Sequence, residues 1–405
     1  MKIEGNGNLS IHYHSPEERT EIGYLNCTAV KEVRNYHSSL PGYSKTPLIS
    51  LTELAKNLGV KAIYVKDESH RFGLNAFKSL GVSFAIGKIL QEELDLSSGN
   101  LSFDVFQDPA ILGKVKNVTF VSVTAGNHGR GLAWFARKIG AKSVIFLPQN
   151  AVKARVDAIR REGAEVKVIN LNYDAAVQAA SDLAEKNGWI LVQDTAWEGY
   201  EDIPTRITQG YSTMSSEALE QLDQLEEDYP THVFLQAGVG SMAGSVVGHF
   251  VNQQSKLLPK FIIAEPENAA CIYKSANVND GKPHGVSGTH STMMAGLACG
   301  EPNINTWEIL RDYASAYISC SDSFSAKGMR RFANPIQGDP AIVSGESGAV
   351  GLGLTESIMT DESLIDIKDN LKLNDQSVVL LFNTEGNTDP ENYNKILERY
   401  NKEDI

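Results

Sequence analysis

Residues 73–81 read Gly73-Leu74-Asn75-Ala76-Phe77-Lys78-Ser79-Leu80-Gly81 and place a lysine where a helical pattern begins. Apolar residues recur at helical spacing over 80–90, and Asn75 is expected to cap this helix. A lysine in the first turn faces the positive end of the helix dipole, and apolar neighbours disfavour its charge further. We therefore expect Lys78 to be a neutral amine suited to Schiff-base chemistry, although most lysines in proteins are simply solvated.

Short apolar strands alternate with helices along most of the chain. Strands are predicted at 62–66, 118–123, 143–147, 166–169, 190–193, 233–235, 261–264 and 378–382, and helices at 151–162, 174–187 and 215–229. This alternation is typical of parallel sheets covered by helices on both faces, so we expect an α/β fold. Residues 1–45 show no strong periodicity and are expected to be irregular, and residues 95–116 look like a linker or an insertion.

The length of the chain, 405 residues, suggests more than one domain. We predict two domains, each a mostly parallel sheet flanked by helices. The large domain comprises residues 1–95 and 210–405, and the small domain comprises residues 96–209. Hydrophobic residues make up 42% of the chain, which is enough for a full core.

Charge and cysteine content exclude several classes of partner. The formal net charge is −13 and no Lys/Arg cluster occurs, so neither nucleic acid nor an anionic membrane is expected as a partner. The four cysteines lie far apart without metal-ligand spacing, so we expect reduced thiols and no metal site. No apolar run approaches the roughly 18 residues of a membrane span, and the first residues lack an apolar leader. The cytoplasm is the expected location.

Three loops that follow apolar strands carry chemically useful groups. Thr124-Ala125-Gly126-Asn127-His128-Gly129 presents backbone N–H groups at a helix start, which suits a carboxylate. Gly238-Val239-Gly240-Ser241 is a glycine-lined turn that lets the backbone close on a phosphate. This turn alone is weak evidence, because it matches neither the dinucleotide fingerprint nor the P-loop. The third loop places the hydroxyl of Thr384 at the end of a strand.

A Schiff-base lysine, a phosphate cradle and a hydroxyl for a ring nitrogen together suggest pyridoxal phosphate as the cofactor. Their order resembles the tryptophan-synthase-like family of pyridoxal-phosphate enzymes, fold type II, from about Thr46 to Asp389. Within that family the chain resembles the diaminopropionate ammonia-lyases, most clearly in residues 194–200, 294–301 and 344–353. The resemblance implies a fold type II enzyme, commonly a homodimer, that acts on a small amino acid.

The resemblance also implies roles for individual residues. Lys78 would bind the cofactor covalently, with Phe77 packed near the ring. Asn127 would bond the ring hydroxyl and Thr384 would meet the ring nitrogen. The phosphate would be held by Gly238, Val239, Gly240 and Ser241. The residues expected to contact the substrate are Thr124, Ala125, Gly126, His128 and Glu346.

The implied reaction is the α,β-elimination of 2,3-diaminopropionate to pyruvate and ammonia. Asp194 directly follows a predicted strand and is the candidate base, although such an aspartate can also cap the next helix. His128 is expected to shape its loop rather than to act as the base. An L-serine or L-threonine dehydratase is the alternative, because the same machinery serves when hydroxide leaves. A non-catalytic binding module is less well supported, because it would need neither Lys78 nor Asp194.

One position departs from the pattern of the diaminopropionate ammonia-lyases. These enzymes carry the sequence Thr-Asp-Gly-Asn-His, whose aspartate serves the D-isomer of the substrate, whereas this chain has Ala125 at that position. The two isomers present their Cα hydrogens to opposite sides of the cofactor, and one base cannot easily reach both. We therefore expect the L-isomer to be preferred.

Overall fold

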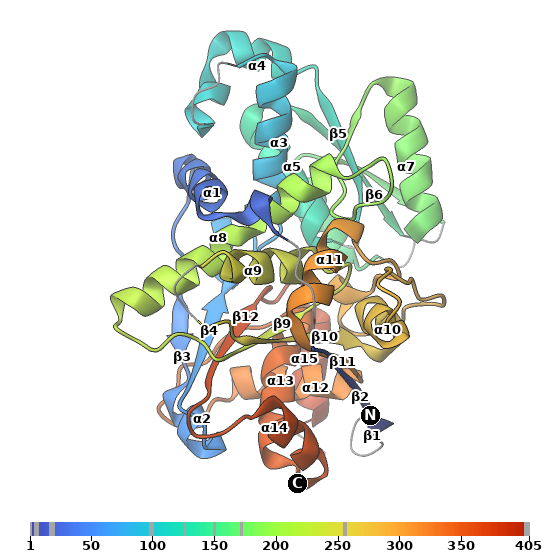
Figure 1. Ribbon diagram of the computed structural model, residues 1–405. Helices are drawn as coiled ribbons and strands as arrows, with labels where there is room; N and C mark the ends of the chain where they lie inside the picture. Colours follow the sequence, from blue (N-terminus) through green and yellow to red (C-terminus); the bar gives the residue numbers. More distant parts are fainter. Residues whose placement is uncertain are drawn as a thin grey trace.

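The apolar strands form two separate sheets in the computed structural model (Figure 1). The structure describes residues 2–3, 8–15, 21–96, 101–124, 126–148, 151–170, 173–253 and 257–400. Within these residues the larger sheet has eight strands, in the spatial order β1 (Lys2–Ile3), β2 (Leu9–Tyr13), β11 (Ala314–Cys320), β10 (Lys260–Pro266), β9 (His232–Gln236), β12 (Val378–Asn383), β4 (Ala62–Asp67) and β3 (Leu48–Ser50). Neighbours from β11 to β4 are parallel, and β1, β2 and β3 add antiparallel strands at the two edges.

Both faces of the larger sheet are buried, which explains why its central strands are apolar throughout. Along β9, Val233 and Leu235 belong to one hydrophobic cluster and Phe234 belongs to another on the opposite face. This alternation follows from the pleat of the strand. Among the helices that contribute, α8 (Asp202–Gln224) and α9 (Ser241–Val251) belong to the first cluster, and α12 (Asp322–Ala333) and α13 (Glu346–Thr360) belong to the second.

The smaller sheet is parallel throughout its described strands, with the order β7 (Glu165–Ile169), β6 (Lys142–Pro148), β5 (Thr119–Val123) and β8 (Ile190–Leu191). Its two faces are covered by α5 (Asn127–Ile139) with α6 (Lys153–Arg161), and by α7 (Tyr173–Asn187). The predicted α/β class with two parallel-rich sheets is confirmed. The small sheet lies inside the predicted small domain, residues 96–209, but the domain boundaries themselves stay a prediction.

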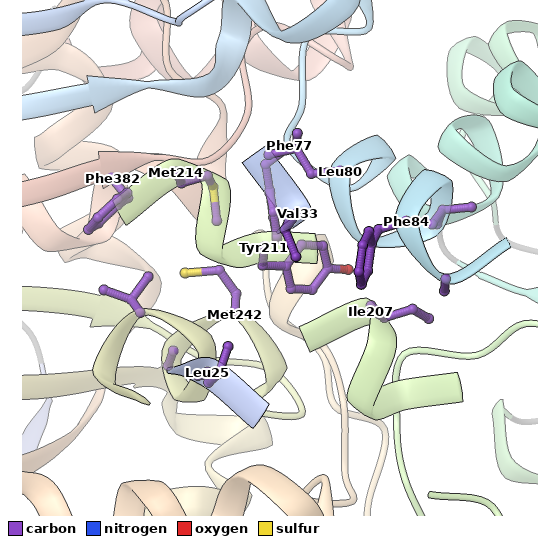
Figure 2. Close-up of a cluster of buried hydrophobic side chains, with 14 of the residues drawn as sticks. Leu25, Val33, Phe77, Leu80, Phe84, Ile207, Tyr211, Met214, Met242 and Phe382 are labelled. Carbon is purple, nitrogen blue, oxygen red and sulfur yellow. The ribbon is translucent and has the colours of Figure 1, made fainter. Parts of the chain in front are cut away.

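Helix α3 (Ser79–Glu93) follows the Lys78 stretch and packs against α8 and α5, so it lies between the two sheets. Figure 1 shows α8 running between the same two parts of the molecule. The close approach depends on Gly81, where a Cβ atom would lie 2.5 Å from Cε1 of Tyr211. Tyr211 in turn packs on Phe77 with 4.7 Å between ring centroids, in the apolar cluster of Figure 2. The residue before Lys78 is thus anchored in the core.

The remaining helices complete the layers. They are α1 (Cys27–Ser39), α2 (Thr52–Leu58), α4 (Pro109–Val115), α10 (Cys271–Val278), α11 (Ile304–Tyr313), α14 (Ile365–Leu371) and α15 (Pro390–Tyr400). Short 3₁₀ helices are η1 (Gly23–Leu25), η2 (Glu68–Gly73), η3 (Phe103–Gln107), η4 (Glu267–Ala269), η5 (Ala295–Leu297) and η6 (Glu362–Leu364). Among the described residues, no helix is both long and apolar enough to cross a membrane.

Three expectations about local structure were wrong. Residues 1–45 include β2 and α1, and residues 95–116 include η3 and α4. Strand β2 is held by pairing with β11, a partner about 300 residues away that no local pattern reveals. Asn75 does not cap α3, because its φ of 56° is left-handed and its carbonyl accepts a hydrogen bond from the Gly386 amide at 2.9 Å. The helix begins only at Ser79.

Candidate active site

The loops that leave β5, β8, β9 and β12 at their carboxyl ends meet around one cavity. Its empty volume is about 1000 Å³, including its open mouth. Ligands of α/β proteins bind at this end of the strands, because the loops there converge from several strands. The predicted site residues that line the cavity are Phe77, Lys78, Thr124, Gly126, Asn127, His128, Asp194, Gly238, Val239, Gly240, Ser241 and Thr384. Ala125 lies outside the described residues, and Glu346 is not among the residues that line the cavity.

Lys78 and Asp194 both line the cavity and are in direct contact. The Lys78 Nζ atom donates to Oδ2 of Asp194 at 2.5 Å. Burial by itself would lower the pKa of Lys78, but the charge of Asp194 and contact with Tyr211 outweigh burial and raise it. The expectation of a neutral amine was therefore wrong for the protein without cofactor. The helix dipole and apolar neighbours are weaker than a carboxylate in direct contact.

Asp194 is an ionised carboxylate in this arrangement. Burial opposes its charge, but Lys78 and, more weakly, His128 lower the pKa of Asp194 to about 2. The Asp194 carbonyl accepts hydrogen bonds from the Ser241 hydroxyl at 2.5 Å and from the side-chain amide of Asn303 at 3.2 Å. Asp194 therefore does not stand free on a loop, because these two bonds fix its backbone against the start of α9.

His128 lies beside this pair with a defined tautomer. Its Nε2 atom is 2.8 Å from the Val192 carbonyl, which can only accept, so Nε2 carries the hydrogen and Nδ1 keeps its lone pair. The Nδ1 atom is 3.9 Å from Oδ2 of Asp194 and has no hydrogen-bond partner among the described residues. Burial lowers the pKa of His128, so the ring is neutral. The Nδ1 lone pair is therefore an acceptor close to Asp194 that no described residue uses.

The glycine-lined turn 238–241 is built to approach an anion. Gly240 has a φ of 97°, which is accessible to glycine but strained for other residues. A Cβ atom at Gly238 would lie 3.2 Å from Cα of Leu297, so a side chain there would crowd the cavity wall. The turn leads into α9, whose first backbone N–H groups and dipole favour a phosphate. This geometry fits the phosphate group of pyridoxal phosphate.

Thr384 fits the ring nitrogen of that cofactor. Its Oγ1 atom accepts a hydrogen bond from Nε2 of Gln236 at 2.8 Å. Because Gln236 supplies a hydrogen to this oxygen, the hydroxyl hydrogen of Thr384 remains available to be donated into the cavity. A neutral hydroxyl donor suits an unprotonated pyridine nitrogen, as the resemblance implied.

Another part of the cavity wall holds the carboxylate of Glu385 and the guanidinium of Arg155. The side-chain amide of Asn127 donates to Glu385 at 2.6 Å. Glu346 lies behind this wall, where it accepts a hydrogen bond from Asn392 at 2.5 Å and lies 3.8 Å from Arg155. Burial, and then the neighbouring charge of Glu385, raise the pKa of Glu346.

Several residues of the site were not predicted. Glu385 lies in the loop of Thr384, and Gln236 lies two residues before the glycine-lined turn, so their position was a usable signal. Arg155 and Asn303 follow no motif, and only the folded chain brings them to the site. Tyr211 was missed because its neighbours in sequence are ordinary residues of a long helix.

Comparisons with known proteins agree with this geometry. The family model described as "Pyridoxal-phosphate dependent enzyme" matches residues 40–362. The chain belongs to this family. Its cofactor is therefore pyridoxal phosphate, as the lysine, the glycine turn and the hydroxyl predicted.

Relatives within the family are ammonia-lyases and dehydratases. Over 377 residues the chain is 48% identical to the diaminopropionate ammonia-lyase of Salmonella typhimurium, a match that covers 93% of each chain. The Escherichia coli K12 enzyme of the same name is 47% identical, over 91% of this chain and 90% of that one. An L-threonine dehydratase of Haemophilus influenzae is 26% identical over 82% of this chain and 55% of its own length. The predicted resemblance to diaminopropionate ammonia-lyases is confirmed.

Comparison with solved structures also places the chain among the pyridoxal-phosphate enzymes. The holo diaminopropionate ammonia lyase of Escherichia coli superposes with a TM-score of 0.89 at 44% identity, covering 96% of this chain and 97% of that one. A threonine deaminase isoform of Solanum lycopersicum gives a TM-score of 0.69 at 18% identity, which shows a common fold alone.

Proposed function

We propose that the protein catalyses the α,β-elimination of 2,3-diaminopropionate, which with water gives pyruvate and two molecules of ammonia. The observation that carries the proposal is the contact between Lys78 and Asp194, in a cavity that also contains an anion-binding turn and a hydroxyl donor. The relatives that share nearly the whole chain are named diaminopropionate ammonia-lyases, which supports the choice of substrate.

Asp194 is proposed as the base that removes the Cα proton of the substrate. Bound pyridoxal phosphate supplies the electron-withdrawing ring that acidifies this proton. While Lys78 is an ammonium, its charge keeps the pKa of Asp194 at about 2, too low for an effective base. Lys78 would hold the cofactor, and in any state in which its amine carried no charge the pKa of Asp194 would lie closer to its ordinary range.

The other residues hold the reactants in place. Residues 238–241 are proposed to bind the phosphate through backbone N–H groups, and Thr384 to donate to the ring nitrogen. Asn127 is proposed to bond the ring hydroxyl, with Phe77 beside the ring. The start of α5, including Thr124, Gly126 and His128, is proposed to receive the substrate carboxylate. Glu346 sits behind the cavity wall, so we assign it a positioning role through Arg155 rather than contact with the substrate.

The L-isomer is proposed as the preferred substrate. The Asp194 carboxylate approaches the cavity from one side, and the position that would carry a second aspartate is Ala125. Steady-state kinetics on both isomers tests this, with Ala125→Asp as the partner variant. Equal efficiency of the wild type on the D-isomer would refute the preference.

A substrate panel tests the reaction itself. Ammonia and pyruvate release are measured with L- and D-2,3-diaminopropionate, L-serine and L-threonine at matched concentrations. We expect the highest kcat/KM with L-2,3-diaminopropionate. A higher value with L-serine or L-threonine would instead establish the dehydratase alternative.

We also propose a homodimer located in the cytoplasm. The cytoplasm is supported by the cysteine usage, because the four cysteines lie far apart without the pattern of a disulfide framework. The homodimer rests on the family resemblance, and sedimentation of the purified protein tests it.

A further inference from the structure

Glu385 is a buried carboxylate on the cavity wall, and it has no role in the proposed removal of the Cα proton. Its exposed fraction is 2%, and it lines the cavity next to Thr384. Its Oε2 atom accepts from the Asn127 amide at 2.6 Å and its Oε1 atom accepts from the Ser347 backbone at 3.1 Å. A carboxylate offers about four acceptor positions, so these two bonds leave room for a further donor from the cavity.

Glu385 forms no direct ion pair with a described residue, although Arg155 also lines the cavity. Lys78 is paired with Asp194 at 2.5 Å, and Arg155 lies 3.8 Å from Glu346. In the part of the chain that the structure describes, no lysine, arginine or histidine lies within ion-pair distance of Glu385. Burying a carboxylate without a cation is costly, and hydrogen bonds alone compensate only in part.

We propose that Glu385 binds the β-ammonium group of the substrate and thereby selects a diamino acid over a hydroxy acid. This proposal rests on the proposed function. The substrate's second amino group is an alkyl amine, protonated near neutral pH, and so supplies a cation for Glu385. Serine has a neutral hydroxyl at the same position, which a carboxylate binds more weakly than a charged donor.

The position of Glu385 suits this role. It follows Thr384, the proposed partner of the ring nitrogen, and its side chain holds Asn127, the proposed partner of the ring hydroxyl. Its backbone forms an isolated bridge with Ala76, two residues before Lys78. The carboxylate is therefore held within the same framework that holds the cofactor.

A purely structural role for Glu385 makes a different prediction. The Ser347 amide lies in the first turn of α13, so Glu385 also faces the positive end of that helix. If support of α13 and Asn127 were its whole role, replacing Glu385 would weaken turnover of all substrates by the same factor. Recognition of the β-ammonium group instead requires that the loss be specific to diamino acids.

The test compares L-2,3-diaminopropionate with L-serine, which differ only in the β-substituent, for the holoenzyme of each variant. Glu385→Gln removes the charge, and its amide can still accept from Ser347 while Asn127 turns its amide to match. We expect kcat/KM for L-2,3-diaminopropionate to fall roughly tenfold or more relative to the value for L-serine in the same variant, mainly through KM. If L-serine is not turned over, its inhibition constant replaces kcat/KM.

Two further variants keep the test decisive. Glu385→Asp retains the charge and should keep much of the preference for the diamino acid. Glu356→Gln removes a buried carboxylate that is paired with Arg331 outside the cavity. It should leave kcat/KM unchanged for both substrates. Cofactor absorbance is recorded for every variant, so that loss of the cofactor is recognised.

An equal loss for both substrates in Glu385→Gln, with the cofactor retained, would overturn the proposal. If Glu385→Gln loses its cofactor, Glu385→Asp decides, because displacing the charge should weaken the preference for the diamino acid in part, and an unchanged preference with an equal loss for both substrates contradicts the proposal. A wild-type enzyme that fails on diaminopropionate but acts on serine would instead refute the proposed function, which is a separate outcome.

Discussion

Lys66 and Lys78 are both lysines in contact with a carboxylate, yet only one is placed to react. Lys66 is fully buried, and its Nζ atom meets three acceptors, the Thr46 carbonyl at 2.7 Å, the Gln221 side chain at 2.7 Å and Glu217 at 2.8 Å. All three of its protons are therefore used. For Lys78, the only hydrogen-bond acceptor the structure gives among the described residues is Asp194, and its Nζ atom lies on the wall of an open cavity.

A reactive lysine is commonly expected to have a lowered pKa, but the pKa shifts of Lys66 and Lys78 do not follow this expectation. Burial lowers the pKa of Lys66 despite its carboxylate neighbours, whereas Asp194 raises the pKa of Lys78. A search for a lysine with a lowered pKa would therefore select the structural one. Two other features distinguish Lys78 better than its pKa does. Its Nζ atom is open to the cavity, and its partner Asp194 can be replaced by a substrate or cofactor group.

The largest expected effect separates the two lysines by activity. Lys78→Ala should abolish elimination, because the covalent attachment point of the cofactor is lost. Borohydride reduction of the wild type should attach the cofactor to a peptide that contains Lys78. A labelled peptide with any other lysine would contradict the assignment, and Lys88→Ala on the surface is the matched control.

Replacing Lys66 should reduce the stability of the protein much more than replacing an ordinary lysine with a partly exposed ion pair. Lys66→Met should lower the free energy of unfolding by about 3–5 kcal/mol, because it breaks a buried ion pair and leaves polar acceptors unsatisfied. Lys88→Met, which breaks a partly exposed pair with Glu32, should cost less than about 1 kcal/mol. Denaturant titration measures both. Similar losses in the two variants would mean that the Lys66 cluster has no special structural role.

Asp194→Asn should impair catalysis and leave cofactor binding intact. The amide keeps the shape of the side chain and removes the proton acceptor, so kcat with L-2,3-diaminopropionate should fall about a hundredfold or more. Absorbance of the bound cofactor serves as the control for folding. Activity near that of the wild type would show that Asp194 is only structural.

The smallest expected effect is a pH dependence of stability in the cofactor-free protein. Because Lys78 depresses the pKa of Asp194 to about 2, the ionised aspartate stabilises the fold above its unfolded pKa of roughly 4. This contribution, on the order of 2 kcal/mol, should be lost as the pH falls from about 4 toward 2. The difference in unfolding free energy between the wild type and Asp194→Asn measures it. A difference that does not shrink in this range would show that the ion pair adds no stability.

Local patterns predicted the parts of the fold that depend on burial along one segment. Eight strands, β4 to β10 and β12, were expected close to their observed bounds, because a strand covered on both faces must be apolar throughout, whereas β11 was not predicted. Gly59 ends α2 with a left-handed φ of 69°, a conformation that glycine adopts without strain. Strand β2 was missed because its residues are held by backbone pairing with β11, which their own pattern does not show.

The sequence by itself indicated the α/β fold class through its alternating strands and helices, and it predicted Lys78, the glycine turn 238–241 and the Thr384 hydroxyl as site groups, because each of these lies in a short local motif. Only the tertiary structure decided the charge of Lys78, the tautomer of His128 and the presence of Arg155 and Glu385 beside the cavity. These properties depend on distances between residues far apart in the chain, such as Asn127 and Glu385. Electrostatic interactions follow distance and burial in space, and neither can be read from the order of residues.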